Sequence, residues 1–176
     1  MSPKCASCPD ERYLDEVRCG FIHKGLAREA VLELKYGGVY AAGAEMGMRL
    51  AEALAGWHGS ADVVVPVPLH RSRQRTRGYN QAAKLAEGFA DRVGLQLDQR
   101  LLRRSRRTRS QAAGLNYEAR FANVQDAFET AQSATGMKIL LVDDVVTTTA
   151  TLQACAAALK AAGAESVCGV SFTREG

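Results

Sequence analysis

Two adjacent carboxylates and a run of hydroxylated residues form the segment of the chain that is best suited to chemistry. Asp143 and Asp144 follow the apolar run 138–142 (KILLV), and residues 147–151 (TTTAT) come two valines later. Carboxylates accept hydrogen bonds from vicinal sugar hydroxyls, whereas hydroxyls and backbone N–H groups at a helix start bind phosphate. The segment therefore offers ligands for both halves of a ribose phosphate.

A simpler interpretation of these residues is open. Asp143 and Asp144 could form a solvated strand end, and the threonines could cap the helix that follows. The conjunction of both features behind a fully apolar strand favours the binding interpretation. The chain contains neither Gly-x4-Gly-Lys-Ser/Thr nor Gly-x-Gly-x-x-Gly, which excludes a Walker loop and the usual dinucleotide fingerprint.

A second unusual loop follows another apolar run. Residues 62–65 (DVVV) are typical of a buried strand in a parallel sheet, and Pro66 and Pro68 end it before the arginine-rich loop 69–77. In open α/β sheets, ligands bind outside the carboxyl ends of the strands. We therefore expect the loops 66–77 and 143–151 to share one pocket.

The elements that position these loops follow from apolar periodicity. The pattern predicts an α/β fold, with a mostly parallel central sheet and helices on both faces. Strands are expected at 62–65, 95–102, 138–142 and 167–172, with a strand-like stretch at 18–23. Helices are expected at 25–35, at 41–57 with Ala44, Met48, Ala51 and Leu54 or Ala55 buried, at 80–93, at 116–124, and before Gly163.

Several motifs together resemble a known family. Residues 140–151 (LLVDDVVTTTAT) are similar to the phosphoribosyl-pyrophosphate motif of type I phosphoribosyltransferases. The ComF-like, competence-associated branch of that family is resembled by 65–70 (VPVPLH), Arg73, Arg75, 77–81 (RGYNQ), 34–38 (LKYGG), 109–111 (RSQ), Arg120 and 123–124 (NV). The resemblance covers nearly the whole chain from about residue 20.

The resemblance implies a site for 5-phosphoribosyl-1-pyrophosphate (PRPP) and Mg²⁺, and displacement of pyrophosphate at ribose C1 by an unidentified acceptor. Asp143 and Asp144 would hold the ribose hydroxyls and the metal. The substrate-binding residues implied are Val145, Val146, Thr147, Thr148, Thr149, Ala150 and Thr151 around the 5′-phosphate, Pro66, Val67, Pro68, Arg75 and Arg77 around pyrophosphate, and Arg109 and Gln111 in a mobile cover formed by 103–111.

The charges required by this reaction agree with the residue types. Breaking the C1–O bond builds positive charge on the ribose and negative charge on pyrophosphate, so carboxylates are needed near the former and cations near the latter. Lys35 could add a cation, or it could simply complement the dipole at a helix end.

Thr149 stands where the family usually has glycine. If this position requires a positive φ, a β-branched residue there costs about 1–2 kcal/mol. A weakened site, or one that senses the sugar phosphate without reacting it, is the expectation that follows.

The distribution of charge suggests a second function. Residues 70–109 carry a net charge of +9, against −5 for the rest of the chain. Such a segment could bind a nucleic-acid backbone. Together with it, the resemblance to the competence-associated branch implies a non-catalytic role in DNA uptake or nucleic-acid processing as the alternative. However, few aromatic residues interleave the basic run 103–109, and a basic loop that closes over pyrophosphate explains the charge equally well.

The remaining features concern domain organisation, zinc binding, cellular location and oligomeric state. The 176 residues fit one domain, which we place at 20–176 after a partial cysteine-bearing segment at 1–19. Cys5 and Cys8 could bind Zn²⁺ with Cys19 and His23, although the strand-like context makes Cys19 a better core thiol. With no apolar signal core and no membrane span, a cytoplasmic location is expected. A homodimer is left open.

Overall fold

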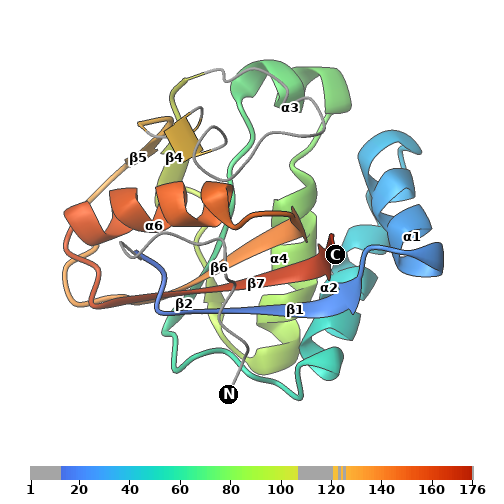
Figure 1. Cartoon of the computed structure of the whole chain (residues 1–176), viewed down its shortest axis with the longest axis horizontal. Helices are drawn as coiled ribbons and strands as arrows, with labels where there is room; N and C mark the ends of the chain where they lie inside the picture. Colours follow the sequence, from blue (N-terminus) through green and yellow to red (C-terminus); the bar gives the residue numbers. More distant parts are fainter. Residues whose placement is uncertain (1–12, 107–120, 123, 125, 176) are drawn as a thin grey trace.

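The fold is built on a five-stranded parallel sheet (Figure 1). The computed structural model describes residues 13–106, 121, 122, 124 and 126–175. In spatial order the strands are β1 (Glu16–Ile22), β7 (Ser166–Arg174), β6 (Lys138–Val146), β2 (Val63–Pro66) and β3 (Gln96–Leu97). Two short strands, β4 (Leu102–Arg104) and β5 (Phe128–Thr130), pair antiparallel as a separate ribbon.

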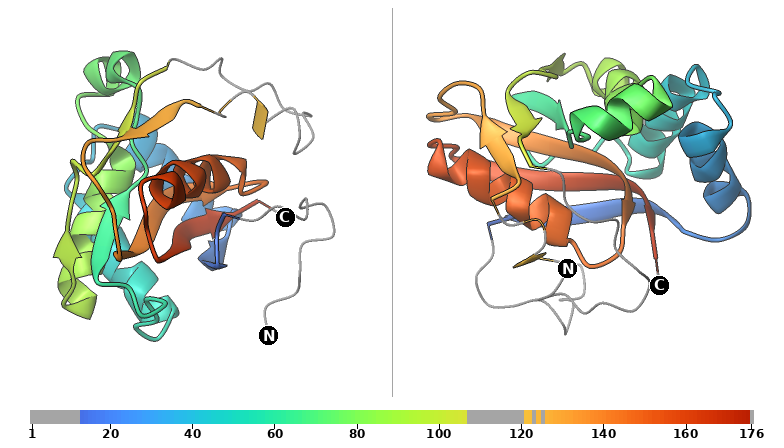
Figure 2. Two further views of the ribbon diagram at one scale, coloured as in Figure 1. Left: turned by 90° about the vertical axis from the view of Figure 1, so that its left-hand side faces the viewer. Right: turned by 90° about the horizontal axis from the view of Figure 1, so that it is seen from above.

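Helices cover both faces of this sheet, which confirms the predicted architecture. Helices α2 (Ala42–Ala53) and α4 (Gln81–Val93) lie on one side and α6 (Ala150–Ala161) lies on the other, as the left view of Figure 2 shows. Helix α1 (Gly25–Tyr36) lies beyond the carboxyl ends of β1, β6 and β7 (Figure 1), and α3 (Arg71–Arg77) follows β2.

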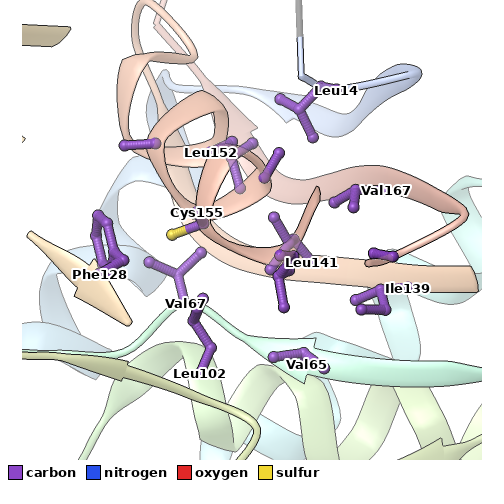
Figure 3. Close-up of a cluster of buried hydrophobic side chains, with 14 of the residues drawn as sticks. Leu14, Val65, Val67, Leu102, Phe128, Ile139, Leu141, Leu152, Cys155 and Val167 are labelled. Atoms are coloured by element: carbon purple, nitrogen blue, oxygen red, sulfur yellow. The ribbon is translucent and has the colours of Figure 1, made fainter. Parts of the chain in front are cut away.

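Each face of the sheet has its own apolar core. Figure 3 shows the core on the α6 side, where Leu141 of β6 meets Leu152 and Cys155 of α6. The opposite core holds Leu140 and Val142 against Leu85 and Phe89 of α4. Consecutive residues of β6 therefore serve different cores, as the two-residue period of a strand buried on both faces requires.

Of the stripe expected to be buried along the second helix, Ala51 is buried and Leu54 packs partly buried against the core, whereas Ala44 and Met48 are not buried. The buried residues of α2 are Gly43, Met46, Gly47, Leu50 and Ala51, and the helix ends at Ala53 instead of continuing to Trp57. Glycines set this face: a Cβ at Gly47 would overlap the carbonyl oxygen of Leu85, and one at Gly88 would overlap that of Ala44. Backbone contact with α4 therefore decides which side of α2 is buried.

Three expected boundaries also change. The loop 69–77 is largely the helix α3, capped by His70 and ended by Gly78 at a φ of 87°. The strand expected at 95–102 is broken, because Asp98 Oδ1 accepts hydrogen bonds from the N–H groups of Arg100 and Leu101 and turns the chain between β3 and β4. The third change is in β6, which continues to Val146 because residues 143–146 also pair with β7.

The remaining sequence expectations concern the cysteines, zinc binding and segments that lie partly outside the described residues. Cys5, Cys8, Arg109, Gln111 and most of the helix expected at 116–124 lie outside the described residues. Cys155 and Cys168 are buried, as expected of packing residues. The structure places Cys19 in β1 and joins His23 Nδ1 to Thr173 Oγ1 at 2.8 Å, while zinc binding and the boundary at residue 19 stay predictions. Among the described residues, no helix is both long and apolar enough to cross a membrane.

Candidate active site

The two loops singled out in the sequence begin on neighbouring strands. Strands β2 and β6 are parallel, and Pro66 lies opposite Val142 in their register. The segment that follows β2 therefore starts beside the carboxylates of β6, at the carboxyl edge of the sheet. Asp143 and Asp144 belong to β6 itself instead of following it, and they are only 9% and 4% exposed.

Asp144 is held by a network of side chains from three helices. Lys35 Nζ of α1 lies 2.7 Å from Asp144 Oδ2. Gln81 of α4 also hydrogen bonds to this carboxylate, and Arg77 Nη1 of α3 donates to Gln81 Oε1 at 2.6 Å. Burial opposes ionisation of Asp144, but the charge and hydrogen bonds of Lys35 outweigh it and lower its pKa. Asp144 is therefore the ionised member of the pair.

Asp143 has a different environment on the α6 side of β6. The backbone N–H of Asp144 donates to Asp143 Oδ1 at 2.9 Å. Burial raises the pKa of Asp143 well above its ordinary value, and the neighbouring charge of Asp144 raises it further. Of these two adjacent buried acids, Asp144 is therefore the one whose ionisation the surroundings favour.

The threonine-rich turn leads directly into α6. This helix begins at Ala150, and Thr149 precedes it at a φ of 57°. The N–H groups of the first helical turn, from Ala150 on, have no acceptors within the helix and lie at its positive end. The left-handed conformation considered for Thr149 from sequence is thus the one that the structure has.

The segment 66–68 has few backbone donors to offer an anion. Pro66 and Pro68 lack N–H groups, and the N–H of Val67 donates to the carbonyl of Val142 at 2.9 Å. The side chain of Val67 packs in the α6-side core, next to Leu102 in Figure 3. Donors for an anion at this loop must therefore come from residue 69 onward or from arginine side chains.

Arginines from separate segments lie around this loop. Arg104 of β4 is partly buried, and it interacts electrostatically with Cys155, Arg73 and Asp143. Burial lowers the pKa of Arg104, although a guanidinium keeps its proton at neutral pH. Arg104 thus lies near both Asp143 and Arg73, whereas the resemblance assigned Arg75 and Arg77 to the pyrophosphate.

The arginines assigned from the resemblance differ in their contacts. Arg77 bonds Gln81 and stacks over the ring of Tyr36, 5.4 Å from its centroid. Arg75 lies on the exposed surface of α3. Gln81 was part of the ComF-like motif 77–81, but the sequence gave it no role, and the structure places it at the first position of α4, after the cap Asn80. Arg104 belongs to the segment 103–111 that the resemblance assigned to a cover over the site, but its place near Asp143 depends on the fold.

Polar loops at the carboxyl edge of a parallel sheet define the class of α/β protein that binds its ligands at that edge. Comparison with known proteins narrows the class. The sequence matches the family model described as "Phosphoribosyl transferase domain" over residues 40–174. The chain therefore belongs to that family.

The relatives by sequence are named for competence or for DNA utilization. Competence protein F of Haemophilus influenzae is 33% identical over 109 residues, which are 60% of this chain and 47% of that protein. Competence protein ComFC of Bacillus subtilis is 38% identical over 90 residues, 51% of this chain and 35% of that one. DNA utilization protein YhgH of Escherichia coli K12 is 34% identical over 106 residues, 60% and 46%. The chain spans less than half the length of these relatives.

Solved structures agree on the fold. The allosteric regulatory enzyme of purine biosynthesis superposes with a TM-score of 0.52 at 22% identity, over 76% of this chain and 26% of that one. Glutamine phosphoribosylpyrophosphate amidotransferase from B. subtilis gives 0.51 at 20% identity, over 75% and 26%. At these identities the likeness concerns the fold alone.

Proposed function

We propose that this protein binds PRPP together with Mg²⁺ and displaces pyrophosphate at ribose C1, with an acceptor still to be identified. The observation that carries the proposal is the buried pair Asp143 and Asp144, placed on β6 immediately before the turn 147–151 and the start of α6. Family membership supports the same reaction class.

The two acids have complementary tasks in this reaction. Ionised Asp144 places a negative charge where positive charge develops on the ribose ring, and Lys35 holds its carboxylate in position. Asp143 offers carboxyl oxygens that accept hydrogen bonds, which suits a sugar hydroxyl. The pair thus orients the ribose and stabilises its charge through the same two side chains.

The anionic ends of the substrate would lie on either side of the ribose. The first turn of α6 would bind the 5′-phosphate through backbone N–H groups and the hydroxyls of residues 147–151. Arg73 and Arg104 would stabilise the departing pyrophosphate, because neutralising a leaving group lowers the barrier to its departure.

Mg²⁺ fits the donor set of this site. Hard carboxylate oxygens are the ligands that Mg²⁺ prefers, and it usually takes only one or two carboxylates in addition to substrate phosphates. Asp143 and Asp144 would hold the ion, which supplies charge neutralisation of pyrophosphate.

Calorimetric titration with PRPP and Mg²⁺ tests the proposal. We expect the parent to bind, and Asp144→Asn to bind at least about tenfold more weakly, since a charge-assisted hydrogen bond contributes roughly 1.5–3 kcal/mol. Asp91→Asn, an exposed acid on α4, is the matched control and should bind like the parent. Equal affinity of all three proteins would overturn the site assignment.

Turnover separates an enzyme from a sensor. Release of pyrophosphate is to be measured with nucleobases, ammonia and amines as acceptors. Release with any of them supports the transferase, whereas binding of PRPP without release in every case would leave a sensor of the sugar phosphate.

A surface beside the site favours a second candidate function, binding of single-stranded nucleic acid. Tyr36 and Tyr40 are 76% and 59% exposed, Tyr40 packs on Tyr79 at 6.0 Å between centroids, and Arg77 lies over Tyr36. Helix α3 adds three further arginines, at 71, 73 and 75. Aromatic rings beside arginines are the usual combination for sequence-tolerant single-strand binding. The fold thus brings next to α3 the aromatic residues that run 103–109 lacks.

Fluorescence anisotropy with a labelled single-stranded oligonucleotide tests this candidate. Tyr36→Ala with Tyr40→Ala should weaken binding about tenfold, because each stacked base contributes roughly 1–3 kcal/mol. Affinity should also fall steeply with salt. The control Tyr13→Ala removes a tyrosine that lies before β1, in another part of the fold. Unchanged binding by the double variant would exclude the surface.

A further inference from the structure

His23 is a half-buried residue to which neither proposed function gives a role. It follows β1 directly, and because β1, β7 and β6 are parallel it lies at the carboxyl edge of the sheet. Its backbone N–H donates to the carbonyl of Arg174 at 2.8 Å. Its ring nitrogen Nδ1 lies 2.8 Å from Thr173 Oγ1. Both the backbone and the side chain of His23 are therefore attached to the end of β7.

The contact between His23 and Thr173 continues to Asp144. Thr173 is fully buried, and its Oγ1 donates to the backbone carbonyl oxygen of Asp144 at 3.3 Å. A hydroxyl has one hydrogen to donate and a carbonyl oxygen can only accept, so Thr173 Oγ1 accepts its second hydrogen bond from His23 Nδ1. A chain of two hydrogen bonds thus joins the ring of His23 to the backbone of Asp144.

The two ends of helix α1 are both connected to Asp144. His23 lies two residues before α1 begins, and β1 leads directly into this helix in Figure 1. Lys35, whose Nζ lies 2.7 Å from Asp144 Oδ2, belongs to the last turn of the same helix.

The position of α1 depends strongly on such polar contacts. Its buried residues are Val31 and Leu34, while Leu26 and Tyr36 are 84% and 76% exposed. The hydroxyl of Tyr79 adds a hydrogen bond to the carbonyl of Leu34. Because apolar burial is the main source of stability in helix packing, a helix that buries so little needs its polar contacts to keep one position.

We propose that His23 is a positioning residue of the candidate active site. Through Thr173 it fixes the backbone at Asp144 and the start of α1, so that Lys35 at the end of α1 meets the Asp144 carboxylate. The inference rests on the proposed function, because it concerns the carboxylate that would bind the ribose of PRPP. His23 acts through Thr173 and α1 and does not itself contact the substrate.

Calorimetric titration with PRPP and Mg²⁺ tests the inference. His23→Ala removes the donor to Thr173 and should weaken binding about fivefold, the effect of one lost hydrogen bond. His23→Asn keeps an N–H donor close to the position of Nδ1 and should restore most of the affinity. No loss in His23→Ala, or an equal loss in both variants, would overturn the inference.

The same titration with Thr173 variants tests the second hydrogen bond of the chain. Thr173→Val keeps the shape of the side chain but cannot hydrogen bond, so it should weaken binding at least as much as His23→Ala. Thr173→Ser keeps the hydroxyl and should bind like the parent. The matched control is His58→Ala, a half-buried histidine that precedes β2 at the opposite edge of the sheet. It should also bind like the parent, and a loss equal to that of His23→Ala would contradict a specific role of His23.

A double-mutant cycle with Lys35→Met separates positioning from a general loss of stability. If His23 acts by presenting Lys35, the two substitutions together should lower the free energy of unfolding by less than the sum of their separate losses, measured by urea denaturation. Additive losses would overturn the inference. This measurement does not involve PRPP, so it decides the role of His23 even where the parent fails to bind PRPP and the proposed function itself fails.

Discussion

The two halves of the candidate active site are organised in different ways. Around Asp144, Lys35 and Gln81 complete a network of ion pairs and hydrogen bonds that exists without ligand. Around Asp143, burial favours the neutral acid, and Thr149 holds a left-handed backbone conformation that a β-branched residue adopts at a cost. The side chains around Asp144 are preorganised. The Asp143 side instead keeps two unfavourable features, a buried carboxyl whose ionisation is disfavoured and a threonine at a positive φ.

The largest expected effect comes from breaking the Asp144 network. Lys35→Met leaves a buried carboxylate without its cation and should lower the free energy of unfolding by about 3 kcal/mol, measured by urea denaturation. Lys84→Met removes a lysine from a more exposed pair with Glu87 and should cost less than about 1 kcal/mol. Equal losses in both variants would mean that Asp144 is not organised by Lys35.

The acids should respond to pH in opposite directions. The pKa of Asp143 is raised in the folded state, so its contribution to stability is present below the ordinary aspartate pKa and lost as pH rises through the folded value. Asp143→Asn avoids that loss and should be more stable than the parent at neutral pH.

Asp144 provides the contrast to this prediction. Its pKa is lowered, so its contribution is present above the ordinary aspartate pKa and lost as pH falls through the folded value. Asp144→Asn should therefore destabilise the protein at neutral pH, and the difference should shrink in acid. Thermal unfolding of both variants across the pH range checks the signs, and shifts of the same sign would contradict the division of roles.

The strain at Thr149 should appear as a gain in stability on substitution. Thr149→Gly should raise the free energy of unfolding by about 1 kcal/mol, because glycine adopts a positive φ without steric cost. Thr151→Gly makes the same change inside α6, where it should destabilise by roughly 0.5–1 kcal/mol. If Thr149→Gly also destabilises in urea titrations, the turn is not strained.

The smallest effect is expected at the outer end of the Asp144 network. Arg77→Ala loses its hydrogen bond to Gln81 and should cost roughly 0.5–1.5 kcal/mol of stability. Arg75→Ala, on the exposed surface of the same helix, should change stability by less than about 0.5 kcal/mol. Denaturation midpoints that do not separate the two variants would place Arg77 outside the network.

The sequence predicted the local features of this molecule better than its tertiary ones. Runs such as 139–142 identify buried strands because every residue is apolar, and the helical period over 80–93 identified α4. The loop 69–77 was misread because arginines on an exposed helix carry no apolar period. The stripe of α2 was misread because glycines count as gaps in a hydrophobic pattern.

The residues of the candidate site also fall into two groups, those that the sequence identified and those that only the tertiary structure places. Asp143, Asp144 and the turn 147–151 are contiguous, so the sequence and its family resemblance identified them together. Gln81 and Arg104 come from other segments and could be placed only once the strand order was known. Whether the identified residues bind PRPP stays a prediction.

The backbone contact between α2 and α4 also affects the candidate active site, because Gln81 belongs to α4. Gly47 and Gly88 leave no space for even one methyl group, so α4 cannot rotate or slide against α2. Gln81 is the first residue of α4, about one helical turn before Leu85, whose carbonyl oxygen lies against Gly47, so the position of Gln81 depends on this contact. A variant such as Gly88→Ala would push α4 away from α2 and shift Gln81. It would therefore weaken the network around Asp144, although the new methyl group meets the backbone of Ala44 and neither carboxylate.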